Sequence, residues 1–190
     1  INGGGDLNMT AFAGITGIEN VSIDDTATIF TANTANLAIT AGNGGNTITL
    51  GSGTQSVNSG SGVDTINLGS GINVVNTGDG ADIVNGALGT GDAVDLDAGN
   101  DTYTLNASST DGSVSGGAGG SDILTIGSAG ITTATIALGD GANTTILGVD
   151  YSNFDNLAAS AADDALTVTA AAGGSTIDTG SAADNVTAGA

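Results

Sequence analysis

The stretch SGSGVDTIN at residues 59–67 is followed by LGSGINVVN at residues 68–76 and by TGDGADIVN at residues 77–85. These nine-residue units carry glycine at their second and fourth places and an apolar residue at their eighth place. Units of the same kind recur at residues 41–49, 50–58, 96–104, 116–125, 138–146, 170–178 and 179–187. A short repeat sustained over neighbouring units predicts a solenoid, in which each repeat stacks on the previous one.

The residue types within each unit indicate a turn followed by a short strand. Glycine at alternate places allows backbone conformations with positive φ and lets the chain approach an ion or another backbone closely. The three residues around the apolar eighth place would point one side chain inward and two outward, as a strand does. Ile and Val at this place suit strands that stack on their own copies. The glycine spacing disfavours helices, so we expect an all-β fold.

The repeat resembles the Gly-Gly-x-Gly-x-Asp-x-U-x nonapeptide of RTX proteins, in which U is a large apolar residue. The resemblance covers residues 41–125 well, 138–146 and 170–187 in part, and the rest poorly. It implies a right-handed parallel β-solenoid (a β-roll) with two nonads in each coil and Ca²⁺ bound between stacked turns. The implied class is that of bacterial surface-layer, matrix or filament proteins and adhesins.

A second, longer similarity suggests how the chain is organised. The segment Gly17–Val21 is echoed by Asn153–Leu157, and Gly44–Ile48 is echoed by Gly173–Ile177. We therefore expect one solenoid module over residues 1–137 and the start of a similar module over 138–190. Both ends of the chain fall inside a repeat, which predicts that it is part of a longer polypeptide.

The charge balance excludes several classes of partner. The chain of 190 residues has 20 acidic residues, no Lys, Arg, His or Cys, and a formal charge of −20. Without basic residues it has no surface for nucleic acid or for anionic lipid. No apolar run approaches the roughly 20 residues that a membrane-spanning helix needs. We expect no nucleic-acid partner and no membrane insertion.

The sixth place of the repeat predicts a metal site on one edge of the solenoid. If two nonads form a coil, Asn46, Asp64, Asp82 and Asp101 stack on one edge, whereas Gln55, Asn73 and Asp92 stack on the other. Stacked strands lie about 4.8 Å apart, and two carboxylates near 4 Å repel by about 4 kcal/mol at an effective dielectric of 20. No basic residue offsets this repulsion, and Ca²⁺ prefers carboxylate and carbonyl oxygens. The predicted metal-site residues are Asp64, Asp79, Asp82, Asp97, Asp101, Asp122, Asp140, Asp184, Gly62 and Gly80.

An alternative explanation needs no metal, because Asp and Asn also favour turns through local hydrogen bonds. On the edge of Gln55 and Asn73, uncharged amides can stack without an ion.

The sequence favours a structural role over catalysis. Without His, Cys or Lys, the usual nucleophile–base pairs cannot form. An acidic pair such as Asp95 and Asp97, or Asp24 and Asp25, leaves a glycosidase chemically open, but nothing marks a sugar site. We expect no enzymatic activity.

The resemblance implies a secreted protein of the bacterial cell surface that folds on binding Ca²⁺ and assembles into a surface layer or extracellular filament. Its implied partners are copies of itself or adjoining modules of the same chain, and a cell-surface glycan is a further one. The alternative from another class is an extender or a ligand-binding region of an adhesin, including the ice-binding type.

Overall fold

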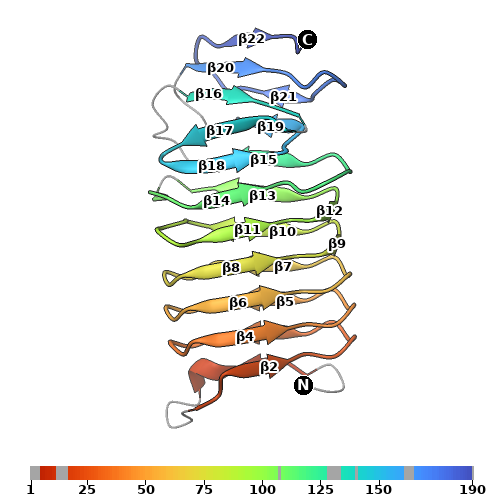
Figure 1. Cartoon of the computed structure of the whole chain (residues 1–190), viewed down its shortest axis with the longest axis vertical. Coiled ribbons are helices and arrows are strands. Elements are labelled where there is room, and N and C mark those ends of the chain that lie inside the picture. The colour runs from red at the N-terminus through yellow and green to blue at the C-terminus, as the bar shows by residue number, and fades with distance from the viewer. Residues whose placement is uncertain are drawn as a thin grey trace.

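The computed structural model describes residues 5–11, 17–106, 108–127, 134–139, 141–160 and 165–189. It is a β-solenoid of stacked parallel strands (Figure 1), and the short 3₁₀ turn Met9–Ala11 is the one helical segment in these ranges. No helix of the described residues is long and apolar enough to cross a membrane. The predicted all-β solenoid is confirmed.

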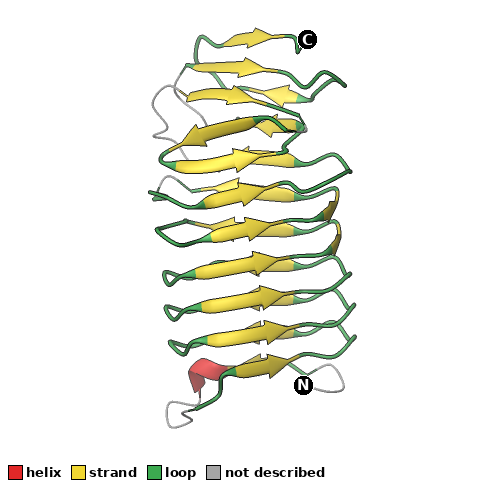
Figure 2. Ribbon diagram, in the orientation of Figure 1, coloured by secondary structure: helices red, strands yellow, loops and turns green. Residues whose placement is uncertain are grey.

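Two sheets form the opposite walls of the solenoid, with turns along both edges (Figure 2). The first sheet contains, in order, β1 (Leu7–Asn8), β3 (Ile29–Thr31), β5 (Thr47–Thr49), β7 (Thr65–Asn67), β10 (Ile83–Gly86), β13 (Thr102–Leu105), β15 (Ile123–Ile126), β19 (Asn156–Ala158) and β21 (Ile177–Asp178). The second sheet contains β2 (Asn20–Ser22), β4 (Leu37–Thr40), β6 (Gln55–Asn58), β8 (Asn73–Asn76), β11 (Ala93–Asp95), β14 (Ser113–Ser115), β18 (Val149–Ser152) and β17 (Asn143–Ile146). The short strands β9 (Asp79–Gly80) and β12 (Ala98–Gly99) pair along one edge.

The register shows two nonads in each coil. Thr47 lies opposite Thr65, and Thr65 lies opposite Ile83, so residues 18 apart stack directly. Ile83 then lies opposite Thr102, a separation of 19, because one residue is inserted after the nonad 77–85. The insertion is absorbed in a turn, and the inward and outward faces of the strands therefore stay in phase.

The core is a narrow stack of apolar side chains between the two sheets. The eighth-place residues Ile48, Ile66, Val84 and Tyr103 are fully buried on the first sheet. Val57, Val75 and Val94 face them from the second sheet with at most 3 % exposure. Each such side chain removes apolar surface from water, which contributes about 1.5–3 kcal/mol.

Near its C-terminal end the stack contains a strand of the opposite direction. After β15 the chain passes to β16 (Ala134–Ala137), which pairs with β20 (Leu166–Thr169) and not with β15. The chain then returns through β17, antiparallel to β18, which rejoins the second sheet beside β14. Beyond this reversal, β22 (Asn185–Thr187) continues from β20. The described strands after residue 138 thus continue the same solenoid (Figure 1).

Substituting two isoleucines on neighbouring strands tests which side chains point into the core and which point outward. Ile66 is fully buried, whereas Ile83 is 40 % exposed on the outer face. We expect Ile66→Ala to lower the free energy of unfolding by about 2–5 kcal/mol, because it leaves a cavity in the core. Ile83→Ala, the matched control, should change it by less than about 1 kcal/mol. Chemical denaturation measures both, and equal losses would contradict the assigned register.

Candidate metal centre

One edge of the solenoid encloses a column of carboxylates. Asp64, Asp82, Asp101 and Asp122, which we call the carboxylate column, each precede a strand of the first sheet (β7, β10, β13 and β15). Because these strands are in register, the four residues stack one above another. Their side chains point into the turn and are at most 2 % exposed.

Hydrogen bonds link each carboxylate to the coil that precedes it in the chain. Oδ1 of Asp64 accepts from the backbone N–H of Asn46 at 2.6 Å, and Oδ1 of Asp82 accepts from that of Asp64 at 2.7 Å. Asp101 and Asp122 repeat this bond to the N–H of Asp82 and Asp101, at 2.7 and 2.9 Å. The column is therefore a continuous chain of backbone-to-carboxylate bonds across the coils.

The second oxygen of three of these carboxylates has no partner. Oδ2 of Asp64, Asp82 and Asp101 is enclosed and makes no hydrogen bond. Leaving a buried polar atom without a partner costs about 1–3 kcal/mol, and more when the group is charged. No Lys, Arg or His exists in the chain to offset the charge. The column thus presents three buried oxygens without a hydrogen-bond donor, which a proton or a cation could satisfy.

The surroundings make ionisation of these groups unfavourable. Burial raises the pKa of Asp64, Asp82 and Asp101, and the backbone N–H bond to each carboxylate lowers it in part. For Asp82, burial together with the charges of Asp64 and Asp101 raises the pKa to about 6. Desolvation and like charge act in the same direction here.

Asn46 occupies the next position of the same edge and closes its turn with its own side chain. It stacks on Asp64, since Thr47 lies opposite Thr65. Its Nδ2 donates to the carbonyl oxygens of Gly42 and Gly44, at 3.4 and 2.5 Å. The amide therefore bonds to the carbonyls four and two residues before it.

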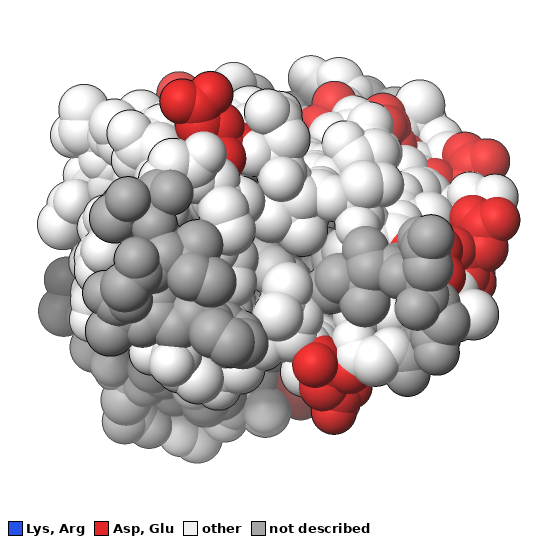
Figure 3. Space-filling view, turned by 90° about the horizontal axis from the view of Figure 1, so that it is seen from below, with Lys and Arg blue, Asp and Glu red and all other residues white. Residues whose placement is uncertain are grey.

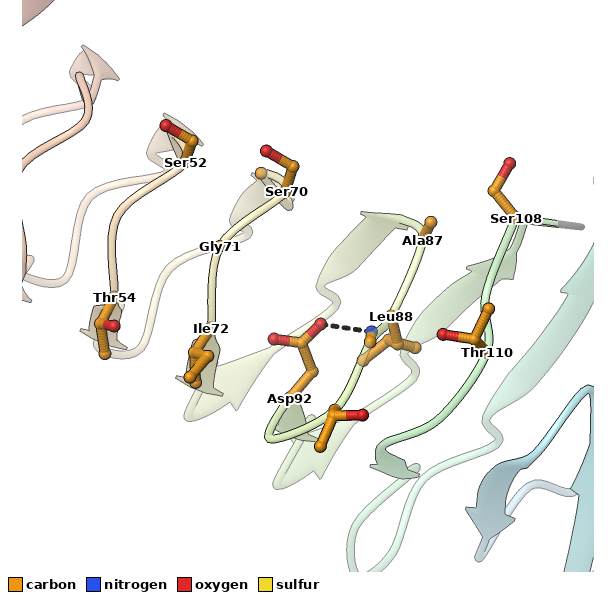
Figure 4. A pocket seen from close by; sticks show the side chains of 13 residues that line it. Ser52, Thr54, Ser70, Gly71, Ile72, Ala87, Leu88, Asp92, Ser108 and Thr110 are labelled. Carbon is orange, nitrogen blue, oxygen red and sulfur yellow. Dashed lines mark hydrogen bonds between the residues drawn. The ribbon is translucent and has the colours of Figure 1, made fainter.

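The opposite edge has no unpaired carboxylate oxygen among its stacked residues Gln55, Asn73 and Asp92. Oδ1 of Asp92 accepts from the N–H of Asn73 at 2.6 Å, and Oδ2 accepts from that of Gly89 at 2.7 Å (Figure 4). The side chain of Asn73 donates to the carbonyls of Gly69 and Gly71, at 3.2 and 2.9 Å. Nε2 of Gln55 donates to a backbone carbonyl at 2.8 Å. These amides thus bond to backbone carbonyls and to Asp92, and the hollow in front of them is lined largely by serine, threonine and glycine.

The predicted site glycines lie two residues before the column carboxylates and against the neighbouring coil. A Cβ added at Gly62 would lie 2.5 Å from the carbonyl oxygen of Gly44, and one added at Gly80 would lie 2.1 Å from that of Gly62. The added Cβ at Gly80 would also lie 2.8 Å from Oδ1 of Asp82. The turns can stack at this spacing only because these positions carry no side chain.

The remaining predicted ligands lie apart from the column. Asp79 is exposed on the outer side of the turn, and Asp97, with φ of 58°, accepts from the side chain of Asn76 at 2.6 Å. Asp184 accepts from the N–H of Leu166 at 2.8 Å, next to β20 and β22. Asp140 lies outside the described residues.

Asp155 joins the column although the repeat did not indicate it. Its Oδ2 accepts from the N–H of Asp122 at 3.2 Å, across 33 residues of sequence. The reversal through β16 and β17 separates the two residues along the chain, so counting by 18 could not find the contact.

The donor chemistry of the column fits a hard cation. Nowhere in the described part of the chain do three or more acidic side chains gather at one point. An ion at the column would therefore combine one or two carboxylates with backbone carbonyls of the turns. Ca²⁺ accepts such a mixture of six to eight oxygens with flexible geometry, whereas Mg²⁺ demands a tight octahedron and keeps its water. Zn²⁺ lacks its usual imidazole and thiolate ligands.

Acidic side chains also lie on the surface of the solenoid. Viewed from its N-terminal end, several lie along one side and others at the top and bottom of the outline (Figure 3). The column carboxylates differ from these groups because they are enclosed.

Substituting one of the turn glycines tests how closely the coils are stacked. We expect Gly80→Ala to lower the melting temperature by several degrees, because the new Cβ overlaps the Gly62 carbonyl and the Asp82 carboxylate. Gly173→Ala is the control, since a Cβ there would meet nothing within 4 Å. If both variants melted like the parent in calcium, the stacking of these turns would be wrong.

The raised pKa of Asp82 predicts that acid favours the metal-free fold. A carboxyl with a pKa of 3.8 when unfolded and about 6 when folded binds its proton more tightly in the folded state. The resulting stability is fully present below pH 3.8 and is lost as the pH rises through 6, a change of roughly 3 kcal/mol for this group. In chelator we expect more strand content by circular dichroism at pH 4 than at pH 7. Asp82→Asn should reduce this difference, and an unchanged difference would contradict the assignment.

No protein-family model, curated protein or solved structure matches the chain. The resemblance of the nine-residue repeat to RTX proteins thus stays a prediction. What the structure does show is a β-solenoid with a buried, uncompensated column of carboxylates along one edge.

Proposed function

We propose that this chain is a structural, calcium-binding β-solenoid segment of a secreted bacterial cell-surface protein. The single observation that supports the proposal best is the set of buried Oδ2 atoms of Asp64, Asp82 and Asp101, which have no hydrogen-bond partner. The chain has no basic residue to offset these buried charges, and a cation from solution would supply the missing positive partner at neutral pH.

Ca²⁺ would be held by the Oδ2 atoms of Asp64, Asp82 and Asp101 and by carbonyl oxygens of the same turns. Gly62 and Gly80 supply two of these carbonyls, since they lie two residues before Asp64 and Asp82. When bound, the ion supplies the positive charge that the chain lacks. Sites of this kind in extracellular modules bind Ca²⁺ at about 10⁻⁴–10⁻³ M, which suits a protein outside the cell.

Binding of the ion would be coupled to folding. The column does not exist in an unfolded chain, so the free energy of binding contributes to the stability of the fold. A free calcium concentration 100 times the dissociation constant adds about 2.7 kcal/mol for each site. Several sites together would shift the folding equilibrium from an expanded chain of charge −20 to the stacked solenoid.

Assembly into a surface layer or filament is the role that we propose for the folded segment. The terminal coils of a solenoid need to be covered. Adjoining modules or copies of the chain could cover them, because they present coils of the same repeat. A cell-surface glycan remains a further candidate. The absence of basic side chains gives no support to nucleic-acid binding, and the absence of His, Cys and Lys gives none to catalysis.

The alternative role in an adhesin, including ice binding, has less support. An ice-binding face would need a regular array of threonines. The outward positions of four successive strands of the first sheet are Thr47 and Thr49, Thr65 and Asn67, Ile83 and Asn85, and Thr102 and Thr104. Ile83, Asn67 and Asn85 therefore interrupt the threonines, so the face is not a regular threonine array. We retain the structural role.

A calcium titration followed by far-UV circular dichroism tests the proposed function. At pH 7 we expect low strand content in excess chelator and a cooperative rise as calcium is added, because the ion offsets the buried charge. Magnesium at the same concentration should restore much less of the signal. Equal strand content in chelator and in calcium would show that the fold does not depend on the ion.

A further inference from the structure

The turns of Asn46 and Asn73 show what can fill the space that the column carboxylates leave unsatisfied. In both turns the side-chain Nδ2 donates to the carbonyl oxygens four and two residues earlier. The two turns lie on opposite edges of the solenoid and follow different strands. The arrangement is therefore a property of the turn in the nine-residue repeat. An amide nitrogen placed there closes the turn without any ion.

The register makes Asn46 equivalent to the carboxylates stacked on it. Thr47, Thr65 and Ile83 lie opposite one another, so Asn46, Asp64 and Asp82 immediately precede aligned positions. Asn46 and Asp64 are 1 % and 0 % exposed. Asp64 and Asp82 carry a second oxygen in place of the amide nitrogen of asparagine, and an ionised carboxylate has no hydrogen to offer to the turn carbonyls.

We propose that the Asn46 amide substitutes for a cation and ends the ion column, so that Asn or Asp at this place decides whether a turn needs an ion. The inference rests on the proposed calcium binding and adds to it a rule for each turn. Asn46 and Asn73 mark turns whose carbonyl oxygens are bonded by the amide nitrogen, although the uncharged Oδ1 atom of each has no hydrogen-bond partner. Asp64, Asp82 and Asp101 mark turns that stay open until a cation arrives.

The physical basis is a balance of charge and hydrogen-bond donors. Two carbonyl oxygens that converge on one point need a positive partner, which an N–H₂ group provides while staying neutral. A carboxylate in the same place adds a third oxygen and a negative charge, so the turn becomes a ligand set for an oxygen-seeking ion. Replacing Asn by Asp exchanges one NH₂ group for an oxygen of similar size. A turn that needed no metal then needs one.

Reciprocal substitutions test the rule. Asp82→Asn should bind fewer calcium ions than the parent, by at least one, as counted by native mass spectrometry. In chelator, with the same stabilising osmolyte for all variants, its melting temperature should exceed that of the parent by roughly 3–8 °C. Asn46→Asp should bind one more ion in calcium and should melt below the parent in chelator.

The control carries the same chemical change at an exposed strand position. Asn58→Asp replaces an exposed amide on the outer face of β6, and it should alter neither the ion count nor the melting temperature in chelator. The rule is overturned if Asp82→Asn keeps the ion count of the parent or is less stable in chelator. It is equally overturned if Asn46→Asp gains no ion or fails to fold in calcium.

The outcome separates this inference from the proposed function. If the parent bound no calcium, the proposed function would fail, whereas Asp82→Asn would still be expected to stabilise the metal-free fold. If the parent bound calcium and the variants left the ion count unchanged, the substitution rule alone would fail.

Discussion

The structure depends on one electrostatic constraint, the stacking of ionisable groups at the spacing of β-strands. Asp64, Asp82 and Asp101 are enclosed one coil apart, in a chain that has no basic residue. At about 4.8 Å, two such charges repel by about 3 kcal/mol at an effective dielectric of 20. The narrow core between the sheets has to offset this repulsion in every coil of the column. Removing the charge, by protons or by a cation, would remove this repulsion.

The two edges of the solenoid meet this constraint in different ways. On the edge of Gln55 and Asn73, neutral amides donate to backbone carbonyls, and Asp92 uses both carboxylate oxygens to accept backbone N–H groups. On the other edge Asp64, Asp82 and Asp101 use one oxygen to join coils, and their second oxygen has no hydrogen-bond partner. The amide oxygens of Gln55 and Asn73 are also unpaired, but they are uncharged. The two edges therefore differ in the charge of their unpaired oxygens.

Close stacking also links the turns to the strands. The carbonyl of Gly62 lies where any side chain at Gly80 would have to be. The same close approach brings successive carboxylates within reach of the N–H of the neighbouring coil. Glycine spacing, strand register and carboxylate stacking are consequences of one repeat length, and a change in any of them disturbs the others.

The sequence by itself determined the strand–turn repeat and the inward direction of the eighth-place residues, and its resemblance to the RTX nonapeptide predicted two nonads in each coil. Period-two strands and alternate glycines leave few other ways to bury Ile48, Ile66 and Val84. It also separated the two edges by charge. Only the tertiary structure decided that β16 and β17 interrupt the stack and that Asp155 joins a column begun 91 residues earlier at Asp64. It also decided that Oδ2 of Asp64, Asp82 and Asp101 is the oxygen left unpaired. The reason is physical: repeat length fixes contacts between adjacent coils, whereas a strand reversal and the partners of a single buried atom depend on how the whole chain packs.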